Sequence, residues 1–465
     1  MRFLLSFDAH KPFSLTNGAS VRMSGTIVAS PGAGQAQELQ VDSLEILGEC
    51  NPDVSLWYLT LDPPVCSRSP LGIPDPETIL DVGIPPRPCP PASPDRRKCS
   101  HAPPPQFACQ LSPRLLRGTF HTPAKTLCSP HPATHQKATQ KHDFCYAHTP
   151  ILTSSDCEGA GETFCVTPSS ASQSQTSSSP ESASPDSHTE FFSKPAYLTV
   201  SSQLHLEALA SSLARVYTLS PCFRAERSQT NRHLAEFWML EAEWAWTKEV
   251  GDVCGLVEAC VKDALHSGRD ERALLARGIA GQEERINNLE TAATSEPWAR
   301  MTYTEAISEL EKYHTSTASR ARPFTFEPKW GHGLQSEHEK WLSEVLVKGP
   351  VFVTDYPSTM KPFYMRRNND ERTVACFDLL VPFVGELVGG SLREERLEPL
   401  QQRMTSHGLD PTGEEYSWYV DLRRYGSAPH GGFGMGFERL VSWVSGIENV
   451  RECIAMPRWA KRMLL

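Results

Sequence analysis

Side chains suited to binding a nucleotide gather in one string, CFRAERSQTNRHLAEFWMLEAEWAW, at residues 222–246. Arg224 can grip a phosphate with a planar fork of N–H donors. Arg232 and His233 follow a polar loop and can reach the same anion, and the Phe237 ring offers a surface on which a base can stack. The alternative is an ordinary amphipathic hairpin with charged residues on its surface.

The second half of this string alternates in character with a period of two. One parity holds Leu234, Glu236, Trp238, Leu240, Ala242, Trp244 and Trp246, and the other holds Phe237, Met239, Glu241 and Glu243. Such alternation with many aromatic residues is typical of a β-strand. We therefore expect two antiparallel strands joined by the loop 228–231, with Arg224 and Glu226 on one face of the first strand.

A second string, GGFGMGFERL at residues 431–440, combines glycines with a charged pair. Glycine lets a backbone pass close to a ligand. We expect a glycine loop that runs into a helix ending near Gly446, with Arg439 in its first turn. The spacing fits neither the G-x-G-x-x-G fingerprint nor a P-loop, which argues against a dinucleotide-binding fold and a P-loop enzyme.

A pair of carboxylates lies in the segment CFDLLVPFVGELVGGSLRE. Asp378 and Glu386 offer the hard oxygen ligands that Mg²⁺ prefers, usually as one or two carboxylates beside substrate phosphates. Because Asp378 lies in an apolar strand, a structural acid is the competing interpretation. The glycines that follow allow Arg393 to approach the same pocket.

Composition sets broad limits on the fold. The 465 residues suffice for two or three domains with a large core. The formal net charge of −10 gives no overall basic surface, so any contact with nucleic acid must be local. The 14 cysteines form no C-x-x-C pair and are typical of reduced thiols. No run of 18 apolar residues is present, and we expect no membrane partner.

Patterns along the chain predict three regions. Apolar and polar residues alternate over 20–50 and predict three short strands, with turns at 30–32 and near Asp42. No segment before residue 18 has strand periodicity over enough length. Residues 52–146 are rich in proline, poor in patterned apolar residues and predicted to be disordered. A serine-rich loop covers 169–189. We expect strands at 196–200, 351–354 and 373–381, a helix at 204–213 and core-packing helices within 250–320.

These strings resemble those of class II aminoacyl-tRNA synthetases. Their amino-acid sequences are most similar to the motifs of asparaginyl-tRNA synthetases of the bacterial and organellar kind. The string at 222–246 resembles motif 2 (F-R-A-E, loop, R-H-L-x-E-F), and the string at 431–440 resembles motif 3 (G-x-G-x-G-x-E-R). AHTPIL at 147–152 resembles the last strand of motif 1. Lys361-Pro362-Phe363-Tyr364 resembles a K-x-F-Y element beside the active site.

The resemblance implies an α+β fold: an antiparallel sheet flanked by helices over residues 147–465. The strands within residues 1–51 would then be a partial OB-fold barrel of the anticodon-binding kind, separated from the catalytic domain by the disordered segment 52–146. The family builds its homodimer through motif 1, and a homodimer is expected here although the motif 1 helix is not recognisable.

The resemblance also implies roles for individual residues. Arg224 would bind the α-phosphate of ATP and Arg439 the γ-phosphate, which makes both catalytic. The remaining implied roles are adenine contacts by Glu226 and Phe237, distal phosphate contacts by Arg232 or His233, Mg²⁺ binding by Asp378 and Glu386, and amino-acid binding by Glu158, Gln203 and Arg393. Glu158 lies in a glycine-hinged loop, EGAG, that would close over the amino acid; the alternative is a solvated loop acid.

The implied reaction uses ATP and Mg²⁺ to convert asparagine to its adenylate and then transfers it to tRNA(Asn), in the mitochondrial matrix. Three alternatives stay open. The chain could be an aspartate–tRNA ligase, which needs an extra cation for the substrate carboxylate. It could be a non-catalytic isoform without the dimer helix. It could also be a relative of the same fold that makes asparagine with ammonia.

Overall fold

The computed structural model describes residues 3–5, 19–29, 37–48, 144–154, 163–168, 191–228, 230–269, 272, 282–316 and 324–463. Of the segment 52–146 that we predict to be disordered, residues 52–143 lie outside the described residues, and so does the predicted serine-rich loop at 169–189. No helix in the described part is long and apolar enough to cross a membrane.

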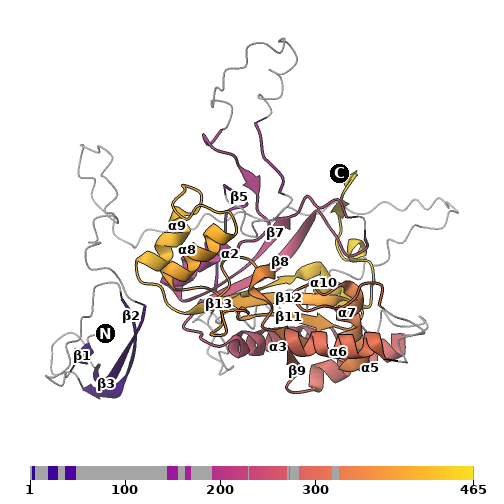
Figure 1. Cartoon of the computed structure of the whole chain (residues 1–465), viewed down its shortest axis with the longest axis horizontal. Coiled ribbons are helices and arrows are strands. Elements are labelled where there is room, and N and C mark those ends of the chain that lie inside the picture. Colours follow the sequence, from indigo (N-terminus) through magenta and orange to yellow (C-terminus); the bar gives the residue numbers. More distant parts are fainter. Residues whose placement is uncertain are drawn as a thin grey trace, which may run out of the picture. The chain divides into compact units, whose positions relative to one another are not determined.

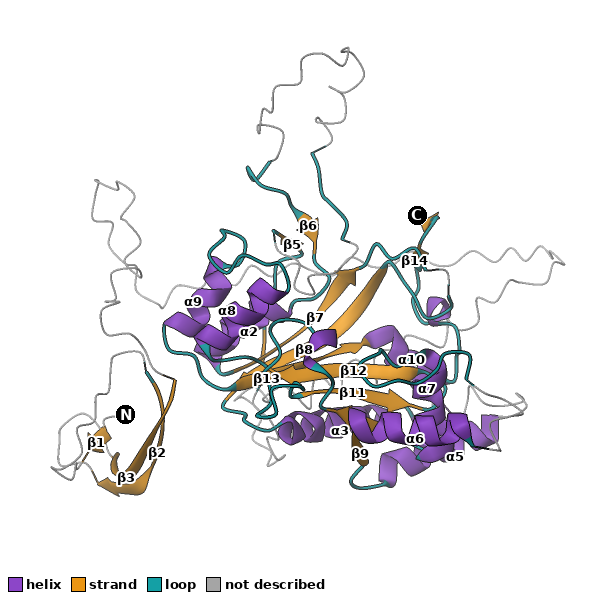
Figure 2. Cartoon of the chain, viewed as in Figure 1, coloured by secondary structure: helices purple, strands orange, loops and turns teal. Residues whose placement is uncertain are grey.

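Ten strands of the described residues form one large sheet (Figures 1 and 2). Its main path runs β15-β14-β8-β13-β12-β11-β10-β9, and β7 pairs with β8 and β4. The strands are β4 (Cys145–Tyr146), β7 (Arg215–Phe223), β8 (Glu236–Ala245), β9 (Ala299–Thr302), β10 (Val351–Thr354), β11 (Cys376–Val381), β12 (Gly385–Leu392), β13 (His430–Gly436), β14 (Arg458–Trp459) and β15 (Arg462–Met463). Only the β4–β7 and β9–β10 pairings within this sheet are parallel. The predicted antiparallel α+β fold is confirmed.

Helices flank this sheet (Figure 2). They are α2 (Gln203–Leu213), α3 (Val250–Ser267), α5 (Gln282–Thr294), α6 (Tyr303–Thr315), α7 (Ser336–Lys340), α8 (Leu397–Ser406), α9 (Ser417–Arg424) and α10 (Phe437–Ser445). The residues of α3 that the sequence predicts to be core, from Val253 to Leu265, are buried against the sheet. Leu240, Ala242 and Trp244 of β8 share that core. The other parity of β8 is therefore left for the opposite face.

The predicted hairpin is present, with β7 and β8 antiparallel and Leu219 opposite Leu240. One detail of the prediction is wrong, because Arg224 and Glu226 lie beyond the end of β7. The Arg224 N–H still donates to the Ala235 carbonyl at 3.0 Å, but the Ala235 N–H donates to the Arg458 carbonyl of β14. The β7–β8 ladder therefore stops at Phe223, and the two charged residues enter a loop.

The glycine string is a strand and not the loop that the sequence predicts. β13 lies between β8 and β12, and the helix α10 follows it directly. Glycine is required because neighbouring groups lie where side chains would be. A Cβ on Gly432 would lie 2.1 Å from Glu243 Oε2 and 2.2 Å from the Ala242 carbonyl oxygen. Because Gly432 has no side chain, the Glu243 carboxylate can lie directly over β13.

The N-terminal strands form a separate three-stranded sheet in the order β1-β3-β2. It contains β1 (Phe3–Leu5), β2 (Ser20–Ala29) and β3 (Gln37–Gly48). The expected turn near Asp42 is wrong, since β3 is continuous and the register shifts there: Ser24 pairs with Ser43, and Gly25 pairs with Val41. Asp42 is the extra residue of a β-bulge. The strand β1 precedes residue 18, but with three residues it is too short to show a period in the sequence.

The large sheet includes residues before the predicted domain boundary at residue 147. Phe144 is buried and its ring packs edge-on against Trp244, with 5.6 Å between the ring centroids. Cys145–Tyr146 form β4, which extends the large sheet beside β7. The last residues of the segment that we expect to be disordered therefore belong to the sheet. A smaller antiparallel pair, β5 (Leu152–Thr153) and β6 (Tyr197–Leu198), follows.

Substituting Gly432→Ala tests why β13 is built of glycine. The new Cβ meets backbone at Ala242 and a buried carboxylate, so we expect a loss of about 1–3 kcal/mol of stability or more. Gly434→Ala is the matched control, because its Cβ would meet only the flexible Met239 thioether, at 3.0 Å. Thermal unfolding of both variants provides the measurement, and equal melting temperatures would contradict the steric account.

Candidate active site

A cavity of about 300 Å³ lies on the face of the sheet opposite α3. The odd parity of β8, Phe237 to Glu243, lines it together with parts of β11, β12, β13 and α10. Every site residue that the sequence predicts lines this cavity, except Glu158, which lies outside the described residues. These residues are Gln203, Arg224, Glu226, Arg232, His233, Phe237, Asp378, Glu386, Arg393 and Arg439.

One end of the cavity is rich in guanidinium groups from the loop between β7 and β8. The Arg224 guanidinium lies over the Phe237 ring, 5.5 Å from its centroid, and 3.9 Å from Glu226. His233 Nε2 lies 3.4 Å from the same Glu226. Burial lowers the pKa of His233, and nearby arginines add to this effect although Glu226 opposes it. A neutral imidazole with cations around it suits an anionic ligand.

The predicted metal pair meets on β11 and β12. Asp378 Oδ1 and Glu386 Oε1 lie 3.6 and 3.4 Å from the point where a Cβ on Gly389 would be. The absence of a side chain at Gly389 therefore leaves a cradle between two hard oxygen ligands, which fits Mg²⁺. No group of three His, Cys, Asp or Glu side chains forms a metal cage in the described ranges.

Cations surround this carboxylate pair. Lys361 Nζ lies 2.9 Å from Asp378 Oδ2 and 4.0 Å from the centroid of the Tyr356 ring. Burial alone would lower the pKa of Lys361, but Asp378 and other acids raise it above its usual range, so the ammonium ion persists. Burial likewise opposes ionisation of Glu386, yet Arg439, Lys361 and Arg224 lower its pKa. Both groups are charged at neutral pH.

Arg439 reaches this region from the first turn of α10. Its Nη1 donates to the Glu386 carbonyl at 3.0 Å and lies 3.6 Å from Glu386 Oε2. The preceding Glu438 turns the other way, where both carboxylate oxygens accept the Trp238 N–H at 3.1 Å. Glu438 thus fixes α10 on β8, and the fixed helix aims Arg439 at the cavity.

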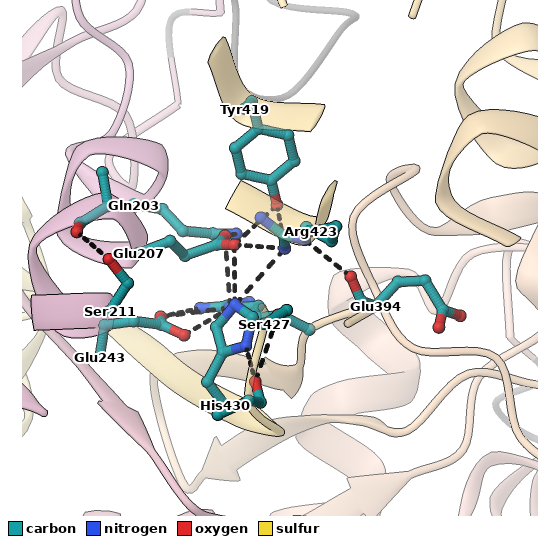
Figure 3. Close-up of polar contacts among 12 residues, drawn as sticks. Gln203, Glu207, Ser211, Glu243, Glu394, Tyr419, Arg423, Ser427 and His430 are labelled. Carbon is teal, nitrogen blue, oxygen red and sulfur yellow. Dashed lines mark hydrogen bonds and ion pairs between the residues drawn. The ribbon is translucent and has the colours of Figure 1, made fainter. Parts of the chain in front are cut away.

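The other end of the cavity holds a buried ion cluster (Figure 3). Arg393 donates to Glu243, with Nη2 2.9 Å from Oε2, and its Nε lies 3.8 Å from Glu207. Gln203 Nε2 donates to Glu207 at 3.0 Å. Arg393 and the two glutamates are at most 3% exposed. An arginine beside a carboxylate presents both donors and acceptors to a ligand.

Glu207 is held in turn by a second set of groups, drawn in Figure 3. Tyr419 OH and Arg423 Nη2 each donate to its Oε2 at 2.7 Å, and His430 Nε2 lies at 3.1 Å. Burial alone would raise the pKa of Glu207, but Arg423, His430 and Arg393 hold it well below its usual range. The carboxylate is therefore ionised and immobile behind Arg393.

Sequence reasoning missed several of these residues. Glu243 carries a usable signal, since it shares the cavity-facing parity of β8 with Phe237. Lys361 stands in the K-x-F-Y element, but its ion pair with Asp378 has no local signature. Glu207 lies one turn after Gln203 on α2, a spacing that a helical projection places on the same face.

The buried Glu438 predicts a pH dependence of stability. Burial raises its pKa from 4.5 to about 7. The unfolded chain loses this proton first, so stability is fully present below pH 4.5 and falls as the pH rises to about 7, by about 3 kcal/mol. Glu438→Gln removes that slope. Denaturant unfolding at pH 5 and pH 7.5 is the measurement, and parallel pH slopes for both proteins would refute the assignment.

A family profile described as tRNA synthetases class II (D, K and N) matches residues 133–460. The asparagine–tRNA ligase of Thermosynechococcus vestitus is 40% identical over 448 residues, which are 96% of this chain and 85% of that protein. The mitochondrial asparagine–tRNA ligase of Saccharomyces cerevisiae is 46% identical over 335 residues, which are 69% of this chain and 64% of that one.

Solved structures agree with these relatives. The asparaginyl-tRNA synthetase of Pyrococcus horikoshii, complexed with asparaginyl-adenylate, superposes with a TM-score of 0.59 at 27% identity. The match covers 96% of this chain and 84% of that one. The profile spans well over half of the chain, and the cavity unites the residues of motifs 2 and 3 at the sheet. The chain therefore belongs to the class II tRNA synthetases and, within them, to the asparagine–tRNA ligases.

Proposed function

We propose that this protein is an asparagine–tRNA ligase that activates asparagine with ATP and transfers it to tRNA(Asn). The single observation that carries the choice of amino acid is the Arg393–Glu243 pair at the closed end of the cavity. The relatives named asparagine–tRNA ligase support the same function. The aspartate-specific, non-catalytic and ammonia-dependent alternatives have no comparable support.

A side-chain amide needs one donor and one acceptor from its site. Arg393 supplies N–H donors for the carbonyl oxygen of asparagine, and Glu243 supplies an acceptor for the amide N–H. An aspartate side chain would instead face the Glu243 carboxylate and repel it. A polar site that leaves its buried groups unpaired with the wrong substrate discriminates strongly. The pair therefore favours asparagine.

The opposite end of the cavity suits ATP. Arg224 is the proposed ligand of the α-phosphate and Arg439 of the γ-phosphate, while Arg232 and His233 would meet the distal phosphates. Phe237 and Glu226 would contact adenine. Asp378 and Glu386 would hold Mg²⁺, which when bound neutralises charge on phosphate oxygens. Gln203 and the lid residue Glu158 are proposed to bind the amino acid.

The reaction follows from this arrangement. The asparagine carboxylate attacks the α-phosphorus, a P–O bond forms, and the bond to pyrophosphate breaks. Negative charge grows on the α-phosphate oxygens, and the fixed Arg224 guanidinium stabilises it without a covalent enzyme intermediate. The tRNA hydroxyl then attacks the acyl carbon of the adenylate and releases AMP.

We propose that the sheet β1–β3 is a partial OB-fold that contacts the anticodon.

Exposed apolar side chains support a homodimer. Ile151, Leu152, Phe164 and Val166, the β5–β6 patch, are each 37–41% exposed. Their backbones are joined by β5–β6 pairing and by the bond from the Leu198 N–H to the Phe164 carbonyl, 2.9 Å. A cluster of apolar groups in water favours burial. A second copy of this chain is the proposed partner.

We also propose the mitochondrial matrix as the location. Support comes from two relatives, the yeast mitochondrial protein and a chloroplastic/mitochondrial protein of Arabidopsis thaliana that is 40% identical. Microscopy of the tagged full chain tests the location, and a purely cytosolic signal would overturn it.

Glu243→Gln tests the amino-acid site. Its charge-assisted bonds are worth about 1.5–3 kcal/mol each, so kcat/KM for asparagine should fall about 10- to 100-fold. Discrimination against aspartate should weaken, because the repelling charge is gone. Amino-acid-dependent ATP–pyrophosphate exchange with both amino acids is the measurement. Wild-type exchange with aspartate alone, or with neither amino acid, would disprove the proposed function.

Phe164→Ser with Val166→Ser tests the dimer. Light scattering should give twice the chain mass for the wild type and a lower mass for the variant, because the variant loses apolar area from the interface. Phe326→Ser, at a residue 56% exposed elsewhere on the fold, is the matched control and should leave the mass unchanged. A monomeric wild type would rule the dimer out.

A further inference from the structure

One carboxylate oxygen on α7 contacts two residues, Arg232 and Glu386, at the end of the cavity that we propose to bind phosphate. Glu339 Oε2 lies 3.5 Å from Arg232 Nη2 and accepts the backbone N–H of Glu386 at 3.3 Å. Arg232 comes from the loop before β8, whereas Glu386 belongs to β12. Glu339 thus links a proposed phosphate ligand to a proposed Mg²⁺ ligand, although it lies outside the three segments that carry the predicted site chemistry, 222–246, 376–394 and 431–440.

The helix that carries Glu339 is held firmly. His338, next to Glu339, is buried, its Nε2 lies 2.9 Å from the Phe326 carbonyl oxygen, and its Nδ1 accepts the Gln335 N–H at 3.1 Å. Ser336, at the start of α7, accepts a second bond from Arg232 Nη1. The Glu339 side chain is 16% exposed. The carboxylate therefore offers Arg232 a fixed partner.

Gly385 provides an independent sign that the contact is built into the fold. Its φ of +83° is one that glycine adopts without strain. A Cβ at this position would lie 2.5 Å from Glu339 Oε2 and 2.8 Å from Arg232 Nη2. The chain leaves room for the carboxylate and the guanidinium above β12. Any side chain here would displace one of them.

We propose that Glu339 is a positioning residue for the ATP phosphates: it holds Arg232 toward the distal phosphates and away from the carboxylates of Asp378 and Glu386. This inference rests on the proposed function for the identity of the ligand. An Arg232 guanidinium released from Glu339 would be free to pair with the Glu386 carboxylate and would then compete with a divalent cation for it. Glu339 keeps the two positive groups at separate places.

The test compares Glu339→Gln with Glu337→Gln. The first variant keeps an acceptor for the Glu386 N–H but loses the ion pair with Arg232. The second is a matched control on the same helix, since Glu337 accepts the N–H groups of Thr325 and Phe326 and does not line the cavity. Calorimetric titration with ATP, at several Mg²⁺ concentrations and without amino acid, measures binding apart from turnover.

We expect Glu339→Gln to raise the Kd and KM for ATP about tenfold, the effect of losing one charge-assisted contact. The Mg²⁺ concentration for half-maximal ATP binding should rise, while KM for asparagine stays within about twofold. In an Arg232→Ala background Glu339→Gln should add nothing, because the two residues act through one contact. Glu337→Gln should bind ATP as the wild type does.

Two results would overturn the inference. One is an ATP affinity of Glu339→Gln equal to that of Glu337→Gln. The other is a parallel rise in KM for ATP and asparagine together with a lower melting temperature, which indicates a general structural role. Absence of asparagine-dependent exchange in the wild type overturns the proposed function instead, and the ATP titrations still decide the role of Glu339.

Discussion

The centre of the molecule depends on pairing the buried charges around Arg393. Glu243 comes from β8, Glu207 from α2 and Arg393 from the end of β12, so one ion cluster joins three elements. Removing one partner of such a buried pair leaves an uncompensated charge and costs about 3–5 kcal/mol. Arg423 and Tyr419 satisfy the remaining acceptor sites of Glu207. The cluster that joins these elements is therefore also the surface that we propose to meet the amino-acid side chain.

Backbone without side chains makes this cluster possible. Gly432 gives the Glu243 carboxylate a path across β13, and Gly389 leaves the cradle between Asp378 and Glu386. Gly390 serves packing, because its Cβ would lie 2.6 Å from the Phe377 ring. Glycine usually weakens a strand. Here the neighbouring strands supply the packing, and the space gained holds charged groups.

Positive charge is concentrated at one end of the cavity, although the chain as a whole is acidic, with a net charge of −10. Arg224, Arg232 and Arg439 gather at one end, and each lies within 4 Å of a carboxylate oxygen. These carboxylates balance the positive charge of the guanidinium groups and hold them in defined positions before a ligand binds. An anion that binds here would replace these long arginine–carboxylate contacts with shorter charge-assisted hydrogen bonds to the arginines. This arrangement suits a triphosphate more than a neutral ligand.

The local patterns can be read from the amino-acid sequence alone. The period of two in β8, the helical spacing in α3 and the strings around Arg224 and Arg439 are short-range signals. Through the family resemblance, such strings predicted the fold class and ten of the residues that line the cavity. Which charged side chains pair with one another depends on the arrangement of the elements in space. Arg393 and Glu243 are 150 residues apart, and Arg232 and Glu339 are 107 apart. Such partners have no common spacing, because sheet order brings them together. The same reason explains the glycine string: whether it is a loop or a strand depends on neighbours β8 and β12, which no local pattern contains.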